Sequence, residues 1–220
     1  TEQAALYDLV IVAAFENEFY LLRPTPDGAV PVDETVFAST LAMDGSRVLV
    51  DRIAEALVAQ GLAVEQYYPE SGPGQFEISV RHAGALHAAD RQIAFRETVN
   101  AIALEHGLIA SFLPKIFPDK AGSGCHLHLS LWRDGANVVA DPQGAESLSS
   151  VARSFIAGVL EHLPALIRAM RFEMQQFGGE RWYATVLAEL QALPRFHGQR
   201  RGHHSAQRRQ LRPPFDDISW

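Results

Sequence analysis

Apolar and polar positions alternate in several short segments of the chain, and this period of two predicts β-strands. In residues 8–22, Glu16 and Glu18 fall on one face of the predicted strand, while Phe15 and Phe19 fall on the other. Residues 75–81 repeat this layout, with Glu77 on the face opposite the apolar side chains. Further strands are predicted at residues 63–68, 108–113, 125–132 and 137–140.

Segments with a period near 3.6 residues predict three helices between these strands. Asp44 is placed to cap a helix that runs through Gln60. A second helix is predicted from about residue 85 to 106, and a third begins near Ser147 and ends near Pro164. Helices separated by hairpin-like strand pairs indicate an α+β fold with a largely antiparallel sheet.

Residues 1–168 are predicted to form one domain, and residues 169–220 form a C-terminal segment that we leave unassigned. The end of this segment loses its apolar periodicity and is crowded with Arg, His and Gln, without any lysine. That composition is typical of disorder or of a sequence translated out of frame.

Charge and composition narrow the classes of partner. Residues 1–168 hold 21 acidic and 11 basic side chains, and the whole chain has a formal net charge of −7. An acidic body argues against nucleic acid as the main partner, because phosphate contacts need clustered Lys and Arg. No apolar run is long enough to span a membrane, so a cytoplasmic protein is expected. Cys125 is the only cysteine, which excludes an internal disulfide.

Carboxylates and imidazoles fall on alternating positions of the predicted strands. Two glutamates on one strand face repel each other unless a cation or a basic residue lies between them. The set comprises Glu16, Glu18, Glu70 and Glu77, with His126 and His128 after the turn Gly122-Ser123-Gly124. An oxygen-rich set with little nitrogen suits Mg²⁺ or Mn²⁺ rather than zinc.

Each of these features has a simpler interpretation. An isolated Glu-x-Glu on a strand is most often a solvated face, and a His-x-His is as often hydrogen-bonded packing as metal ligation. A short glycine turn is by itself poor evidence for phosphate binding. The recurrence of the layout on separate strands favours a metal site.

Three segments, FENEFYLL, ESGPGQFE and GSGCHLHLSL, occur in this order and resemble the glutamine synthetase family in its catalytic domain. The resemblance covers roughly residues 8–168. It implies that Glu18, Glu70 and Glu77 bind one divalent ion. It further implies that Glu16 and His126 are two of the three ligands of a second ion.

The resemblance also implies nucleotide contacts at Glu65, His128 and Ser130, and a substrate loop that holds the amino acid through the backbone at Gly122. The family usually has asparagine before that glycine, whereas this chain has Ala121, so the preference for glutamate is open. The arginines that the family uses lie beyond the third helix. No counterpart is assigned in residues 169–220.

The implied activity is an ATP-dependent ligation of a γ-carboxylate, glutamate or a similar one, to ammonia or a small amine, with two Mg²⁺ or Mn²⁺ ions. For intact family members the resemblance implies a homo-oligomer. Two alternatives stay open: an inactive relative that retains metal and nucleotide binding, and a metal-dependent hydrolase built on the same carboxylates. The hydrolase is less favoured because the sequence shows no general base or nucleophile at a spacing that would place it beside the carboxylates.

Overall fold

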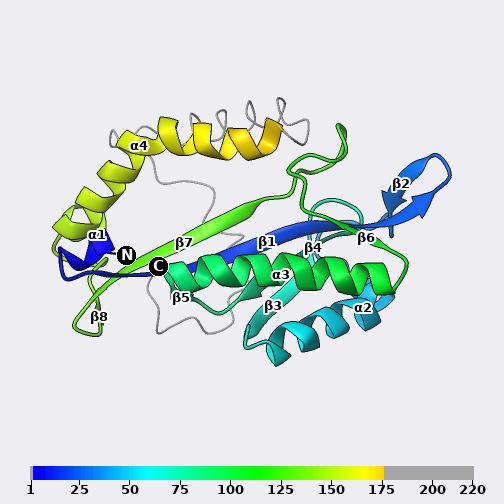
Figure 1. Cartoon of the computed structure of the whole chain (residues 1–220), viewed down its shortest axis with the longest axis horizontal. Coiled ribbons are helices and arrows are strands. Elements are labelled where there is room, and N and C mark those ends of the chain that lie inside the picture. Colours follow the sequence, from blue (N-terminus) through cyan, green and yellow to red (C-terminus); the bar gives the residue numbers. More distant parts are fainter. Residues whose placement is uncertain (1, 176–220) are drawn as a thin grey trace. The chain divides into compact units, whose positions relative to one another are not determined.

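The computed structural model describes residues 2–175, which include a sheet of eight strands (Figure 1). The main strand order is β3-β4-β1-β7-β8, while β2, β5 and β6 each pair with β1. All of the registered strand pairs within the described residues are antiparallel. The predicted α+β class with a largely antiparallel sheet is therefore confirmed.

The chain divides into two compact units, the first ending at Ala136 and the second beginning at Asn137. The elements of the first unit are α1 Glu2–Ala5, β1 Val10–Thr25, β2 Gly28–Pro31, α2 Thr40–Ala59, β3 Val64–Pro69, β4 Gln75–Val80, β5 Ala83–Gly84, α3 Ala85–Glu105, β6 Ile109–Ser111 and β7 Cys125–Arg133. Strand β8 (Ala136–Asn137) follows β7 across the turn Asp134-Gly135, where Gly135 has a φ of 75°.

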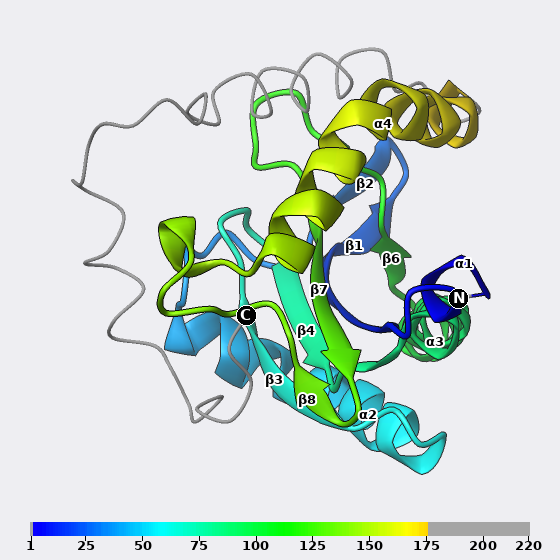
Figure 2. The same cartoon turned by 90° about the vertical axis from the view of Figure 1, so that its left-hand side faces the viewer.

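Helices α2 and α3 cover one face of the sheet, as Figures 1 and 2 show. Large apolar side chains of β1 and β4, among them Phe19 and Phe76, pack there against Ile53 of α2 and Phe95 of α3. Each of these four side chains is fully buried. The alternation along β1 that buries Phe19 turns Glu16 and Glu18 to the opposite face, as the sequence predicts.

Two boundaries in the first unit differ from the prediction by more than two residues. Helix α2 begins at Thr40 and not after Asp44, because the Ser39 hydroxyl accepts a hydrogen bond from the Ala42 amide (3.4 Å) and caps the helix one turn earlier. Strand β1 continues to Thr25, beyond its predicted end at residue 22, and the turn Pro26-Asp27 joins it to β2 in a β-hairpin. The residues that flank this turn have a weak strand pattern, and pairing with β1 stabilises them as strand.

The second unit contains a 3-10 turn, η1 (Ala145–Ser147), and the long helix α4 (Ser150–Gln175). The prediction that this helix ends near Pro164 is wrong, because the helix continues through that proline. A proline inside a helix removes one hydrogen bond, but good helix formers on both sides compensate for the loss. The predicted C-terminal segment lies outside the described residues from position 176 on. Among the helices in residues 2–175, none has the length and apolar content needed to cross a membrane.

Candidate metal centre

The face of the sheet opposite α2 and α3 gathers the acidic and imidazole side chains, and we call it the carboxylate face. Strand β1 lies between β4 and β7, so its glutamates meet residues from both neighbours. Glu18 is directly opposite Glu77 of β4, and Glu16 is directly opposite His126 of β7. The carboxylate face consists of Glu16, Glu18, Glu77, His126 and His128, with Glu70 from the turn between β3 and β4.

Glu18, Glu70 and Glu77 converge as the sequence predicts, with one carboxylate oxygen of each lying within 4.8 Å of the others. Oxygens bound to one Mg²⁺ at about 2.1 Å lie at most about 4.2 Å apart. Three atoms within 4.8 Å of one another lie within about 2.8 Å of a common point, so each oxygen needs to move by at most about 0.7 Å to reach a shared ion. Within the described part of the chain, no lysine or arginine forms an ion pair with any of the three.

Burial sets the protonation of this cluster. Burial raises the pKa of Glu77 to about 7, even though a hydrogen bond from the Tyr68 hydroxyl acts in the opposite direction. Burial likewise raises the pKa of Glu18, against the effect of a hydrogen bond from the Gly124 amide. Charged forms of these carboxylates are thus penalised in the metal-free protein, and a divalent cation offsets that penalty. The donor set fits Mg²⁺ or Mn²⁺ in charge and ligand type.

Glu16 lies between two imidazoles. Its Oε2 is 2.8 Å from Nδ1 of His126, and its Oε1 is 2.8 Å from Nε2 of His128. These two hydrogen bonds lower the pKa of Glu16 to about 2, and the contact with Glu16 raises the pKa of His126. The structure therefore brings Glu16 and His126 into contact, and their role as ligands of a second ion stays a prediction. It also adds His128, for which the sequence predicts a nucleotide contact, to the same cluster.

The glycine-rich loop lies directly beside Glu18. The Gly124 amide donates to Glu18 Oε2 (2.9 Å), and a Cβ at Gly124 would stand 2.8 Å from Glu18 Oε1, so a side chain there would displace the carboxylate. Gly122 is equally confined, because a Cβ would lie 2.7 Å from the Pro114 carbonyl oxygen. The Gly122 carbonyl accepts a hydrogen bond from Gln75. The proposed backbone contact of Gly122 with the amino acid stays a prediction.

The two other predicted nucleotide contacts do not join this cluster. Glu65 lies at a β-bulge on the edge strand β3, where it pairs with Arg81 (2.8 Å). Ser130 is 1 % exposed, and its hydroxyl accepts a hydrogen bond from Nε1 of Trp132 (2.9 Å). Strands β4 and β1 separate β3 from β7, so Glu65 and Ser130 lie on different parts of the sheet. Their roles stay predictions.

Some polar residues of the site were not identified from the sequence. Tyr68 and Ser79 both hydrogen-bond Glu77, and Gln75 hydrogen-bonds Glu18. The alternation along β4 puts Gln75, Glu77 and Ser79 on one face, and this signal was available. The partnership of Tyr68 with Glu77 depends on the register of β3 against β4, which the sequence does not specify.

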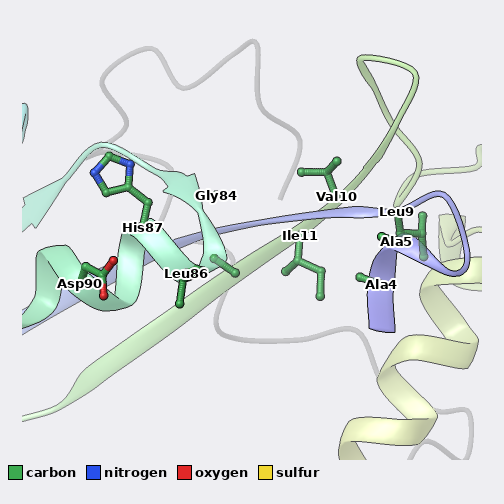
Figure 3. Close-up of a pocket in the computed structure, with 10 residues that line it drawn as sticks. Ala4, Ala5, Leu9, Val10, Ile11, Gly84, Leu86, His87 and Asp90 are labelled. Carbon is green, nitrogen blue, oxygen red and sulfur yellow. The ribbon is translucent and has the colours of Figure 1, made fainter. Parts of the chain in front are cut away.

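A mostly apolar pocket lies at a different place, between α1, the start of β1 and the start of α3 (Figure 3). Val10 and Ile11 line it from the strand, and Leu86 lines it from the helix. Six residues of extended strand, about 20 Å, separate Val10 from Glu16. This pocket is therefore not part of the carboxylate face.

Comparison with known proteins decides the family. The family profile described as "Glutamine synthetase, catalytic domain" matches residues 1–173. The chain belongs to the glutamine synthetase family. The predicted resemblance is confirmed, and the match includes all of the residues of the carboxylate face.

Relatives of this glutamine synthetase family member have different names. The chain is 38 % identical over 171 residues to "Type-1 glutamine synthetase 1" of Dictyostelium discoideum, covering 73 % of this chain and 34 % of the relative. It is 43 % identical over 166 residues to "Gamma-glutamylpolyamine synthetase GlnA3" of Streptomyces coelicolor, covering 74 % and 35 %. The chain thus spans about a third of the length of these curated relatives.

Solved structures agree with the fold. The structure described as "GmaS/ADP complex-Conformation 1" has a TM-score of 0.69 and 32 % identity, over 76 % of this chain and 39 % of that chain. A structure described as "Crystal structure of novel glutamine synthase homolog" also has a TM-score of 0.69, with 34 % identity over 75 % and 38 %.

Proposed function

We propose that this chain forms the metal- and nucleotide-binding part of an ATP-dependent ligase. The ligase joins the side-chain carboxylate of glutamate, or a similar γ-carboxylate, to ammonia or a small amine. One observation carries the proposal: Glu18, Glu70 and Glu77, from separate segments, bring their oxygens within 4.8 Å of one another on the carboxylate face. The membership of the family and the ADP named for one structural neighbour support it.

In this function, Glu18, Glu70 and Glu77 hold one divalent ion, and Glu16 and His126 contribute to holding a second. Divalent ions bound there offset the negative charge of the phosphates during transfer to the carboxylate. The residues are on strands or in a short turn between strands, which keeps the ligands at fixed separations. The ligation itself transfers the γ-phosphoryl group of ATP to the substrate carboxylate, and the amine then displaces phosphate.

The proposal includes more than one acceptor amine. One relative is named for polyamines and another for glutamine synthesis, at similar identity to this chain. A small-amine acceptor and ammonia are therefore both included. A cytoplasmic location belongs to the proposal as well, since ATP and glutamate are abundant in the cytoplasm. Self-assembly into a homo-oligomer is proposed on the membership of the family alone.

Metal binding is tested by titrating Mn²⁺ into the full 220-residue chain by calorimetry at pH 8. We expect Glu18→Gln and Glu77→Gln each to weaken Mn²⁺ binding by at least about tenfold, because each removes one charged ligand. Glu55→Gln is the matched control, since it makes the same charge change on an exposed side chain of α2. Equal affinities for all four proteins would overturn the proposal.

Catalysis is tested by phosphate release from ATP with glutamate and, in turn, ammonia, short diamines and polyamines. Release that depends on both glutamate and an amine supports the ligase. ATP-dependent calorimetric heat without phosphate release would instead assign an inactive, nucleotide-binding relative. Release from ATP with no dependence on the amine would favour the hydrolase.

A further inference from the structure

Gln75, the first residue of β4, is a fully buried polar side chain at the centre of the carboxylate face. Its Nε2 donates to Glu18 Oε2 (3.0 Å) and to the Gly122 carbonyl (2.9 Å), and a longer contact of 3.3 Å goes to the Ser123 hydroxyl. Its Oε1 accepts from the Gly72 amide (2.8 Å). One side chain therefore joins a candidate metal ligand to two separate loops.

The orientation of this amide follows from its partners. If the amide were rotated by 180°, its oxygen would face the Glu18 carboxylate and the Gly122 carbonyl, and its NH₂ group would face the Gly72 amide. All three contacts would become repulsive, so the observed orientation is the one that the network allows. A buried donor or acceptor without a hydrogen-bond partner lowers the stability of the fold, so these contacts hold the amide in this orientation.

Glu18 is held from two sides. Its Oε2 accepts hydrogen bonds from Gln75 and from the Gly124 amide, and its backbone amide donates to the Gly124 carbonyl (3.2 Å). Both side-chain hydrogen bonds end on Oε2, and within the described residues Oε1 accepts none. The orientation of the Glu18 carboxylate therefore depends on the position of the glycine-rich loop. Gln75 donates a hydrogen bond to the carboxylate and another to the loop.

A second contact holds the same loop without touching Glu18. Tyr20 is opposite Gln75 in the register of β1 and β4, and its hydroxyl donates to the Ala121 carbonyl (2.7 Å). Gln75 and Tyr20 thus anchor adjacent carbonyls of the loop, at Gly122 and Ala121. Gln75 also reaches the carboxylate, whereas among the described residues the hydrogen bond of the Tyr20 hydroxyl goes to the loop.

The geometry points to Gln75 as a positioning residue that couples divalent-ion binding at Glu18 to the ordering of residues 121–124. This inference rests on the proposed function, because the ion is the one that Glu18 is proposed to bind. Fixing Glu18 Oε2 through Gln75 and Gly124 prepares Oε1 for the ion, and an ion bound there in turn holds the loop. Binding of the metal and closure of the predicted substrate loop become one event.

The test is hydrogen exchange on the full chain, with and without Mn²⁺, together with calorimetric Mn²⁺ affinities. In the wild type, we expect Mn²⁺ to slow exchange of the Gly124 amide, which is bonded to Glu18. Gln75→Met keeps the side-chain length and removes the polar contacts. We expect it to weaken Mn²⁺ binding by about tenfold, as for other partners of metal ligands, and to abolish the slowing at Gly124.

Tyr20→Phe is the matched control. It removes the hydroxyl contact with Ala121 and keeps both hydrogen bonds to Glu18 Oε2, so its loss of Mn²⁺ affinity should be smaller than that of Gln75→Met, and Mn²⁺ should still slow exchange at Gly124. Equal losses of affinity in Tyr20→Phe and Gln75→Met would reduce Gln75 to a general support of the loop and overturn the coupling. Wild-type affinity and wild-type protection in Gln75→Met would overturn it too.

Two further measurements apply if Gln75→Met does not fold or if the wild type does not bind Mn²⁺. If circular dichroism shows that Gln75→Met does not fold, Gly124→Ala tests the coupling from the loop side. The added Cβ displaces the Glu18 carboxylate without removing any ligand, so the Mn²⁺ affinity should fall. An unchanged affinity would contradict the inference. If the wild type does not bind Mn²⁺, the proposed function fails. In that case, faster Gly124 exchange in metal-free Gln75→Met supports the link from Gln75 to Glu18, and unchanged exchange rejects it.

Discussion

Glu18 and Glu77 lie directly opposite each other on the antiparallel strands β1 and β4, with both side chains on the carboxylate face. Like charges directly opposite in a sheet destabilise the pair. Burial is the main cause that raises the pKa of both groups, that of Glu77 to about 7, and the charges of neighbouring carboxylates add to it, so Glu77 holds a proton below pH 7 in the metal-free protein. Placing Glu18 opposite Glu77 therefore lowers the stability of the metal-free protein, and a bound cation offsets this loss.

Binding of Mn²⁺ is expected to depend steeply on pH. Below pH 7, Glu77 carries a proton that must leave before the carboxylate can bind an ion, so the affinity falls as the pH falls. We expect a loss of up to about tenfold for each pH unit below 7, and a plateau above pH 8. Calorimetry at pH 6 in two buffers of different ionisation enthalpy measures the proton released. An affinity that is flat from pH 6 to 8 would contradict this prediction.

The stability of the metal-free protein should change in the opposite sense. The folded-state pKa of Glu77 lies above its unfolded value of 4.5, so the folded protein binds more protons between pH 4.5 and 7. The free energy of unfolding therefore falls as pH rises through this window, by up to about 3 kcal/mol from this group. Urea denaturation of the wild type and of Glu77→Gln isolates the contribution. The difference between the two proteins should grow towards pH 7.

Tyr68 and Tyr67 provide a matched pair of hydroxyl deletions. Tyr68 donates to Glu77 on the carboxylate face, while the Tyr67 hydroxyl donates to Asp51 of α2 (2.8 Å) on the other face. Tyr68→Phe removes a bond that lowers the pKa of Glu77, so the midpoint of the Mn²⁺ pH profile should move upwards. At pH 7 we expect about three- to tenfold weaker binding. Tyr67→Phe should leave the profile unchanged, and equal shifts would refute the assignment.

The pairing of Glu16 with His126 is testable by NMR. The carboxylate raises the pKa of the His126 imidazole, so Glu16→Gln should lower that pKa towards its ordinary value near 6.5. In the wild type, the stability from this pair is present below pH 6.5 and is lost as pH rises through the raised pKa. The ring resonances of His106, whose Nδ1 bonds the Ile102 carbonyl on α3, serve as the internal control. An unchanged His126 titration would contradict the contact.

The core beneath the site can be tested separately from the chemistry. Phe95 of α3 is fully buried and meets the ring of Phe112 edge-on, with ring centroids 6.2 Å apart. Phe95→Ala should lower the free energy of unfolding by about 3–5 kcal/mol, because it leaves a cavity between α3 and the sheet. Phe37→Ala is the control, since half of the Phe37 surface is exposed and its loss should cost far less. Urea denaturation measures both.

Periodicity predicted the main elements because the strongest patterns are local. The face assignment of Glu16 and Glu18 against Phe19, and of Glu77 against Phe76, follows from alternation alone and is confirmed by the register of β1 and β4. Element ends were less accurate. Ser39 caps α2 before the predicted start, and α4 passes through Pro164, because caps and long-helix stability depend on neighbours that periodicity does not report.

The sequence by itself determined which side chains share a face and which kinds of ligand they offer, because both follow from residue order along a strand. It also indicated the family, through three short segments in order. Only the tertiary structure decided which strands are neighbours. Placing β1 between β4 and β7 brings Glu70 and Glu77 to Glu18, joins His128 to Glu16, and buries Gln75 between a carboxylate and two loops. Those contacts depend on strand order and register, which are set by packing across the whole sheet and not by any one segment.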